Sequence, residues 1–448
     1  MQFQAEQAKK LLDSAKTKGA TEGDLLVVEG DSFSTQVRLG EVEKISNARG
    51  KSLGLRLFFG KRSAITSTSD FSPASLEQLV SDTCELAQIA EEDPFSGLPE
   101  EAKYAQSFPK LDLIDEEIDA ISIDEKIEMA LRTERAALET DPRLDNSEGA
   151  DFSHSYNEVL YVTSNGFSGT NQGSGASLSV SPIASEKGQM QRDYWYSSKR
   201  KFRQLDSPES VGQKAAKRTL RRLGARKVST QKAPIIFEPE IAGSLLGHIA
   251  SALSGYALYK KASFLTDQIG NLITSNLINI VDDPTLAEGF GSRPFDGEGL
   301  PSYKKTIVEN GVLKSYLLDT YSGKKLGLSS TGNAVRGTGG GPGVGISNLH
   351  MLPGTHSQEE IIASVQSGLL VTELIGFGIN LITGDYSRGA AGIWIENGEL
   401  AYPVEELTIA GKLQDMYQNI ELLGNDVDLT RSIAAPTLKI SEMMIAGN

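Results

Sequence analysis

Apolar residues recur at helical spacing at the start of the chain and alternate with polar residues soon afterwards. Alanine and leucine repeat every three or four positions in residues 3–18, which predicts an amphipathic helix. Residues 25–29, 34–39 and 53–59 have the alternating or β-rich patterns of strands, and their order predicts an antiparallel meander. The turns between these strands are predicted at Gly30-Asp31, Gly40 and Gly60.

Hydroxyl side chains mark the starts of four further helices. Ser72 and Ser207 each precede a proline, which places an N-cap before the first helical position. Ser122 and Ser357 are each followed three residues later by glutamate, the spacing of a capping box. The predicted helices run from 73 to about 91, from 123 to about 139, from 208 to about 224 and from 358 to about 367.

The remaining pattern is that of strands separated by glycine. Several strands are predicted between 145 and 202, and Asn397-Gly398 predicts a two-residue hairpin turn near the C-terminus. The predicted C-terminal strands are 369–374, 379–383, 391–396 and 399–403. Turns within the earlier group are predicted at Gly166, Gly169, Gly173 and Gly175.

These elements predict an α+β protein of two domains, since 448 residues are many for one hydrophobic core. We expect an N-terminal α/β domain over 1–228, with small mixed or antiparallel sheets and two segments of about 1–110 and 111–228. A β-rich C-terminal domain with a few helices is expected over 229–448.

Composition and charge exclude several classes of function. The formal net charge of −15 argues against a general attraction to nucleic acid or to an anionic membrane. Cys84 is the only cysteine, so an intrachain disulfide is impossible, and its apolar neighbours predict a buried, inert thiol. The N-terminus lacks the apolar core of a signal peptide, and no apolar run approaches the ~18 residues of a membrane helix. A cytoplasmic protein is expected.

Two segments depart from the average composition. Residues 199–232 are basic, and because no recognition motif accompanies them, a solvated face or a contact with an acidic partner surface is favoured over nucleic-acid binding. Residues 337–345 are rich in glycine. They match neither phosphate-binding glycine motif, so a mobile surface loop is favoured over a phosphate site.

Histidines supply little support for a metal centre. None of His154, His248, His350 and His356 belongs to an HExxH motif, which would place two imidazoles on one face of a helix. His248 alone could coordinate a metal. A hydrogen-bonded structural histidine beside Ile249 and other apolar residues is the favoured interpretation.

A polar segment near the C-terminus is a better candidate site. Its four side chains are bracketed by glycines at the end of an apolar strand, and Arg388 could pair with a carboxylate through two hydrogen bonds. A site for a substrate backbone or a partner group and a plain turn held by an Asp385–Arg388 ion pair both fit. The segment is Gly384, Asp385, Tyr386, Ser387, Arg388 and Gly389.

The same segment, continued to Glu406, resembles the C-terminal signature of the TldD/PmbA metalloprotease family. Residues 243–255 resemble the helix on which the TldD branch carries its HExxxH zinc ligands. In that register the two ligand positions are Gly247 and Ala252, and His248 takes the glutamate position. The chain is therefore similar to the PmbA branch, also called TldE.

The resemblance implies a function. In this family a TldD-type subunit holds zinc, and a PmbA-type subunit pairs with it to form an intracellular protease for short or unfolded peptides. This chain would then hold no zinc or other cofactor, contribute no catalytic residue, and form homodimers when alone. A self-sufficient peptidase with unrecognised ligands and a non-enzymatic modulator of DNA gyrase are the alternatives. The candidate contacts to substrate or partner are His248, Gly384, Asp385, Tyr386, Ser387 and Arg388.

Overall fold

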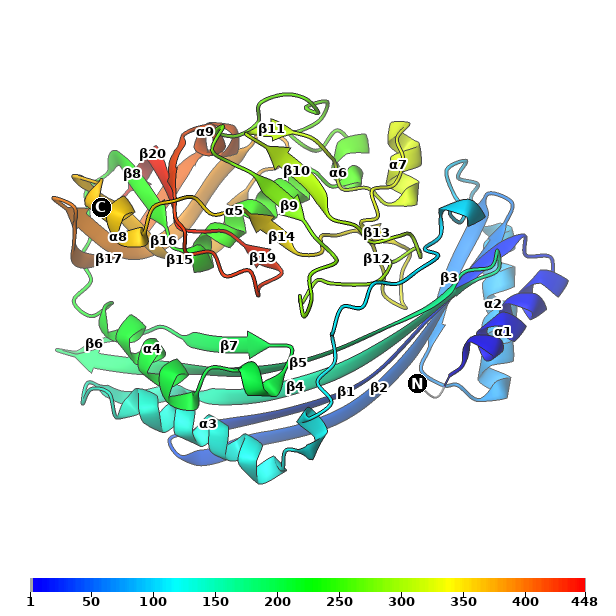
Figure 1. Cartoon of the computed structure of the whole chain (residues 1–448), viewed down its shortest axis with the longest axis horizontal. Helices are drawn as coiled ribbons and strands as arrows, with labels where there is room; N and C mark the ends of the chain where they lie inside the picture. Colours follow the sequence, from blue (N-terminus) through cyan, green and yellow to red (C-terminus); the bar gives the residue numbers. More distant parts are fainter. Residues whose placement is uncertain (1–2, 448) are drawn as a thin grey trace.

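The computed structural model describes residues 3–447 as two layers that face each other along the molecule. A long curved sheet with its helices forms the first layer, from the N-terminus to about residue 223 (Figure 1). Residues from about 230 onward form the second layer, which lies over the concave side of this sheet. The expected α+β class is confirmed.

The sheet of the first layer has seven strands, and each pair of neighbouring strands in it is antiparallel. Their order is β3-β2-β1-β4-β5-β6, and β7 pairs with a different part of β5 from β6. The strands are β1 (Glu22–Arg38), β2 (Glu41–Phe59), β3 (Arg62–Thr68), β4 (Leu144–Thr163), β5 (Ser168–Glu186), β6 (Gln189–Arg192) and β7 (Trp195–Lys199).

Four helices lie against the convex side of this sheet (Figure 1). Three of their predicted N-caps are confirmed, because the hydroxyls of Ser72, Ser122 and Ser207 each accept a hydrogen bond from the backbone N–H three residues later. Cys84 is buried as expected. The helices are α1 (Ala5–Thr17), α2 (Pro73–Ile89), α3 (Ile123–Leu138) and α4 (Pro208–Leu220), and short 3-10 turns occur at Glu101–Lys103, Ile118–Ala120 and Phe202–Gln204.

Several glycines predicted to form turns instead lie inside long strands. Strand β1 continues through Gly30, where a Cβ would come within 2.4 Å of the Asn157 side chain on β4. Gly169 lies in β5, and a Cβ there would meet the ring of Phe295 at 2.6 Å. Gly173 and Gly175 are likewise within β5, against Arg200 and Phe290. These glycines permit close packing, whereas Gly40, Gly60 and Gly166 do form turns with positive φ.

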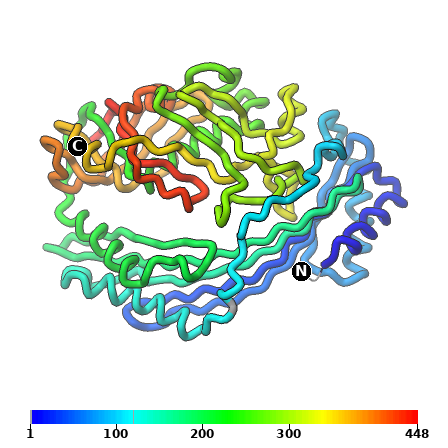
Figure 2. The backbone as a smooth tube through the Cα atoms, in the orientation of Figure 1, coloured from blue at the N-terminus to red at the C-terminus, as the bar shows by residue number. Residues whose placement is uncertain are grey.

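A connector of residues 90–122 runs between the two layers, as the backbone trace in Figure 2 shows. Ala105 donates its N–H to the carbonyl of Gly299 in the second layer, whereas Leu113 accepts from the N–H of Ser174 in the first. The connector is therefore hydrogen-bonded to both layers.

The second layer contains a small closed barrel. Strands β17, β16, β15, β8 and β20 pair in this order, and the pairing of β17 with β20 closes the ring, while β18 pairs with β20 outside it. Apolar residues of the barrel and of helix α5 share one core. The elements are β8 (Gln231–Phe237), α5 (Pro239–Ala252), β15 (Ser367–Ile379), β16 (Asp385–Glu396), β17 (Glu399–Lys412), α9 (Leu413–Gln418), β18 (Ile420–Leu423) and β20 (Leu438–Ala446).

A five-stranded sheet of order β11-β10-β9-β14-β19 and a separate hairpin complete the second layer. Its elements are α6 (Gly255–Tyr259), β9 (Ile280–Asp282), β10 (Lys305–Glu309), β11 (Val312–Leu313), α7 (Thr320–Leu326), β14 (Leu349–Met351), α8 (Gln358–Ala363) and β19 (Ile433–Ala434), and β12 (Ala334–Val335) with β13 (Gly343–Val344) forms the hairpin. None of the helices within residues 3–447 is long and apolar enough to cross a membrane.

Predictions for the C-terminal strands are confirmed only in part. The capping box at Ser357 and the turn at Asn397-Gly398 form, with φ of 54° and 81° in the turn. Residues 380–383 are not a strand, because β15 ends at Ile379 and the chain reverses before Asp385. The segment from Asp385, predicted to follow a strand, begins strand β16.

Most of the basic residues of 199–232 form ion pairs within the chain. Arg221 and Arg218 both bind Glu238, and Arg222 binds Glu373, each at 3.3 Å or less. Lys201 binds Asp112 at 2.6 Å. The acidic surface that these residues were expected to meet on a partner is thus supplied by this chain, and three of these pairs join the two layers.

The glycine-rich segment is also held in place. Arg336 is buried and binds Asp24 of the first layer. The hydroxyls of Thr338 and Ser52 lie 2.6 Å apart, and a Cβ at Gly54 would meet the Thr338 carbonyl oxygen at 2.2 Å. Gly337, Gly339 and Gly341 are exposed, as expected for a surface loop, but Arg336 and Thr338 dock the β12–β13 hairpin on β1 and β2.

Candidate substrate or partner site

Strand periodicity divides the polar segment of β16 between two faces. Tyr386 and Arg388 point to the barrel interior, where Tyr386 joins the apolar core. Asp385 and Ser387 are exposed on the other face. Only half of the predicted polar set can therefore act together.

The outward residues are engaged in local contacts. Asp385 lies 3.5 Å from Lys412 and accepts a hydrogen bond from the Thr383 hydroxyl, and these groups lower its pKa, the hydroxyl more than the ammonium. Gly384 has φ of 80° directly before the strand, and a Cβ there would overlap the Gln414 side chain. The Asp385–Arg388 ion pair considered from the sequence does not form, because the two side chains lie on opposite faces.

The inward residues meet His248 of α5. The His248 and Tyr386 rings have centroids 6.1 Å apart at an interplanar angle of 65°. Arg388 donates from Nη2 to the Leu374 carbonyl at 3.4 Å, and its guanidinium lies 5.9 Å from the ring of Phe377. Phe377 itself is 94% exposed. The structure thus brings three of the six candidate residues together, which we call the His248 cluster: His248, Tyr386 and Arg388.

Each residue of the His248 cluster carries a buried polar atom without a hydrogen-bond partner among residues 3–447. These atoms are His248 Nε2, the Tyr386 hydroxyl and Arg388 Nε. Buried polar groups in folded proteins are nearly always paired, because an unpaired one costs about 1–3 kcal/mol. Three such atoms in one cluster leave room for hydrogen bonds to water or to a group from outside the chain.

Burial sets the charge state of the cluster. It lowers the pKa of His248, and the nearby positive charge of Arg388 lowers it further. Burial raises the pKa of Tyr386 to about 12, against the opposing effect of Arg388. At neutral pH the cluster is a neutral imidazole, a phenol and one guanidinium, which together suit a carbonyl or a carboxylate oxygen.

The donor set does not fit a zinc ion. Structural and catalytic zinc sites use three or four His, Cys, Asp or Glu ligands, and no group of three such residues in the described chain could hold a metal. Gly247, directly before His248 on α5, and Ala252, four residues after it, have no side-chain donors. His350 Nε2 is engaged with the Arg431 carbonyl at 2.8 Å.

Comparison with known families identifies the class of protein. Residues 230–447 match the PmbA/TldA metallopeptidase C-terminal domain, 116–223 match the central domain and 23–87 match domain 1. The chain therefore belongs to the PmbA/TldD family of metalloproteases.

Relatives from the PmbA branch match over nearly the full chain. The metalloprotease PmbA of Escherichia coli O157:H7 is 39% identical, over 97% of this chain and 94% of that protein. A PmbA homolog of Haemophilus influenzae is 37% identical, over 96% of this chain and 94% of its own. A metalloprotease TldD homolog of the same species is 25% identical over 89% of this chain and 87% of its own length.

Solved structures share the fold. A crystal structure from Bacteroides thetaiotaomicron, described as a modulator of DNA gyrase, superposes with a TM-score of 0.92 at 30% identity, covering 99% of this chain and all of that one. TldE of Thermococcus kodakarensis superposes with a TM-score of 0.87 at 24% identity, covering 98% of this chain and 99% of its own. The second likeness concerns the fold alone.

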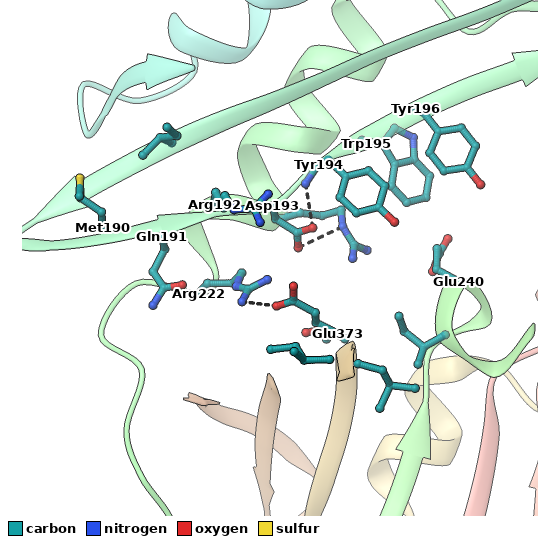
Figure 3. Close-up of a pocket in the computed structure, with 16 residues that line it drawn as sticks. Met190, Gln191, Arg192, Asp193, Tyr194, Trp195, Tyr196, Arg222, Glu240 and Glu373 are labelled. Carbon is teal, nitrogen blue, oxygen red and sulfur yellow. Dashed lines mark hydrogen bonds and ion pairs between the residues drawn. The ribbon is translucent and has the colours of Figure 1, made fainter. Parts of the chain in front are cut away.

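A second concave feature was not found from the sequence. A cavity of about 680 Å³ opens between the two layers beside β6, β7, α5 and β15 (Figure 3). Tyr194 and Tyr196 project into it from the first layer, towards Glu240 and Glu373 of the second. The run Tyr194-Trp195-Tyr196 was the available signal, but only the strand topology gives it a position. We call this feature the interlayer cavity.

Proposed function

We propose that this chain is the metal-free, PmbA/TldE-type subunit of a heteromeric zinc metalloprotease that degrades or processes short or unfolded peptides. Zinc and the catalytic residues are supplied by a TldD-type partner, and the complex works in the cytoplasm. This chain completes the substrate chamber and orients the substrate.

One observation carries the proposal. The family fold is retained together with helix α5, but the two positions that the resemblance to the TldD branch assigns to zinc ligands are Gly247 and Ala252. Neither residue has a side-chain donor, and a five-residue spacing on an ideal helix turns about 140° away from the starting face. The adjacent His248 has a lowered pKa and faces a positive charge, which opposes binding of a cation.

The His248 cluster gives this subunit a specific task. Arg388 Nε and the Tyr386 hydroxyl are donors, and a neutral imidazole can donate or accept. A peptide carbonyl or a carboxylate would satisfy them at once, with a charge-assisted bond from the guanidinium. The exposed Phe377 beside Arg388 could contact the same bound peptide or partner. We therefore assign the cluster to substrate or partner positioning.

Metal analysis and reconstitution test the subunit role. The purified chain should contain far less than one zinc per molecule by mass spectrometry and should not cleave an unstructured fluorogenic peptide. Adding a TldD-type chain should produce chelator-sensitive cleavage above the rate of that chain alone. Stoichiometric zinc with cleavage by this chain unaided would establish the self-sufficient peptidase instead.

A matched pair of variants on β16 tests the cluster. Arg388→Met should lower kcat/KM of the reconstituted complex at least tenfold, because it removes the inward guanidinium. Ser387→Ala on the outward face should leave kcat/KM unchanged. Equal effects of the two substitutions would remove the argument for the cluster. Circular dichroism should show that both variants are folded.

The alternative of a non-enzymatic modulator of DNA gyrase is suggested by the description of the Bacteroides relative. A net charge of −15 favours a protein contact over DNA for such a role. Tight binding to gyrase that persists without a TldD-type chain, combined with no effect on its peptidase activity, would favour this alternative.

A further inference from the structure

The interlayer cavity has the size and composition of a ligand site. Its volume of about 680 Å³ lies inside the range of about 300–1,000 Å³ typical of such sites. Apolar side chains line it together with two tyrosines whose rings stack at 6.3 Å and 15°. The cavity is distinct from the His248 cluster, none of whose residues lines it.

One wall of the cavity is an open sheet edge. Within residues 3–447, strands β6 and β7 pair with β5 only, so their other sides carry main-chain groups without a strand partner. Residues 190–196, which contain most of this edge, line the cavity. Exposed strand edges are the sites at which an extended peptide adds as a further strand.

The opposite wall is a second free edge. Strand β15 pairs in parallel with β8 only as far as Val371, which lies opposite Phe237. Beyond that point the chain of β8 turns into α5, and the β8 side of residues 372–375 has no strand partner in the described chain. These four residues line the cavity. A peptide in the cavity would therefore run between two edges whose main-chain groups have no strand partner in the described chain.

The charged side chains of the walls are paired with one another or with neighbouring side chains. Arg222 lies 2.5 Å from Glu373. The contact is drawn as a dashed line in Figure 3. Arg218 lies 3.3 Å from Asp193. Glu240 lies 3.5 Å from Arg431 and Arg192 lies 3.0 Å from Glu148. Walls without spare charge suit a peptide main chain better than a small charged molecule.

We propose that the interlayer cavity binds an extended peptide segment by strand addition to the β6–β7 edge. The peptide's side chains would pack on Tyr194 and Tyr196 and on Ile241 and Leu374 across the cavity. Main-chain hydrogen bonds make such a site tolerant of sequence, and alternate side-chain contacts give a mild apolar preference. This inference rests on the proposed function and deepens it, because it gives the metal-free subunit its own site for unfolded substrate.

The cavity also leads towards the His248 cluster. Leu374 lines the cavity, and its carbonyl accepts the hydrogen bond from Arg388. On α5, Ile241 at the cavity and His248 at the cluster are seven residues apart, so they lie two turns apart on one side of the helix. A peptide in the cavity would thus have one end directed to the cluster.

Binding of matched peptides to the full chain, without a TldD-type subunit, tests strand addition. The probe is a fluorescein-labelled, unstructured ten-residue peptide of valine, threonine and lysine. Two further versions carry N-methyl groups on the odd or on the even amides. In a strand, alternate N–H groups point to opposite sides. At least one methylated version should therefore bind at least tenfold more weakly than the parent.

Two variants and hydrogen exchange locate the bound peptide. Ile375→Arg at the cavity mouth should weaken binding at least fivefold, whereas Ile382→Arg, outside the cavity, should not. The two isoleucines are a matched pair, 58% and 60% exposed. Peptide should protect the amides of 189–196 and 372–375 from exchange.

Three results would overturn the proposal: equal affinity for all three peptides, protection elsewhere, or no binding up to 1 mM of the parent peptide. The zinc and reconstitution measurements do not depend on this site, so failure here would leave the subunit role standing. Peptide binding at the cavity without activity on adding a TldD-type chain would support the peptide site and contradict the subunit role.

Discussion

The two layers meet in different ways at the two ends of the molecule. At the end of the molecule that carries the β12–β13 hairpin, buried charges and aromatic rings fill the contact between the two layers. Near β6 and β7 the same two layers leave the interlayer cavity open. The first end is therefore closed by packing, whereas the second joins the layers through the ion pairs of Arg218 and Arg222 and retains main-chain edges and aromatic surface for a ligand.

Asp24 is the centre of the filled end. Its side chain is fully buried and accepts hydrogen bonds from Arg56 of the same sheet, from Arg336 of the second layer and from Tyr161 at 3.1 Å. The positive charges overcome the effect of burial and lower the pKa of Asp24. An aromatic and aliphatic cluster covers this network: Leu26, Tyr104, Tyr161, Phe167, Phe295 and Leu300.

The contrast teaches which contacts hold the layers together. Buried charges must keep their partners, because a single unpaired charge costs several kcal/mol. Exposed aromatic groups around the open cavity have no such constraint and can exchange water for a ligand. Substitutions at the filled end should therefore affect stability, whereas substitutions of the exposed tyrosines at the cavity should affect binding.

The largest effect is expected for Asp24→Asn. This change leaves two buried guanidiniums without their carboxylate, and the expected loss is about 3–5 kcal/mol in the free energy of unfolding. Urea denaturation followed by circular dichroism measures it. Asp31→Asn is the control, since Asp31 lies 3.3 Å from Arg49 but both are well exposed, and its cost should stay below about 1 kcal/mol. Similar losses for both variants would refute the special role of the filled end.

A steric change at the same end should have the next largest effect. A Cβ at Gly54 would overlap the Thr338 carbonyl, so Gly54→Ala should push the β12–β13 hairpin from β2 and cost about 1–3 kcal/mol. Gly50→Ala lies on the same strand with open space around its Cβ, and should be neutral. Thermal unfolding of the two variants makes the comparison. Equal melting temperatures would show that the hairpin does not hold the layers.

The pH dependence of stability should also report on the filled end. Burial raises the pKa of Glu298 to about 7, with further contributions from Asp296 and Asp319 that Arg56 partly opposes. A raised pKa means that the folded state holds its proton more tightly than the unfolded state. This stabilisation is complete below about pH 4.5 and is lost as pH rises to about 7.

Glu298→Gln should therefore flatten the stability profile between pH 4.5 and 7. The variant has no proton to lose, so its stability relative to the wild type should improve with rising pH, by about 3 kcal/mol at most. Denaturant midpoints measured at half-unit pH steps would show this. A wild-type profile parallel to that of the variant would contradict the assignment.

Local signals explain what the sequence predicted well. The helices after Ser72, Ser122, Ser207 and Ser357 begin where predicted, because an N-cap acts within four residues, although the last of them ends at Ala363 rather than near 367. Gly30 and Gly169 were assigned to turns although both lie in strands. Their requirement for glycine comes from Asn157 and Phe295, which are distant in sequence. A long-range contact of this kind leaves no local pattern.

For the candidate site, the sequence proposes His248 and the β16 segment, but it does not say which side chains of the segment share a face. Which side chains point inward was decided by where β16 begins, at Asp385. The interlayer cavity could not be predicted from the sequence, because a strand edge can be recognised as unpaired only when the partners of every strand are known. Residues 190–196 and 372–375 carry no motif that would join them.

The smallest effect on stability is expected at the cavity. Tyr194 is 54% exposed, and its ring contact with Tyr196 is worth about 0.5–1.5 kcal/mol, so Tyr194→Ala should cost no more than about 1.5 kcal/mol. Tyr303→Ala is the control, since Tyr303 is 48% exposed and lies outside the cavity. Urea midpoints should barely separate the two variants. Affinity for the parent peptide should separate them, because only Tyr194 belongs to the wall on which a bound strand would pack.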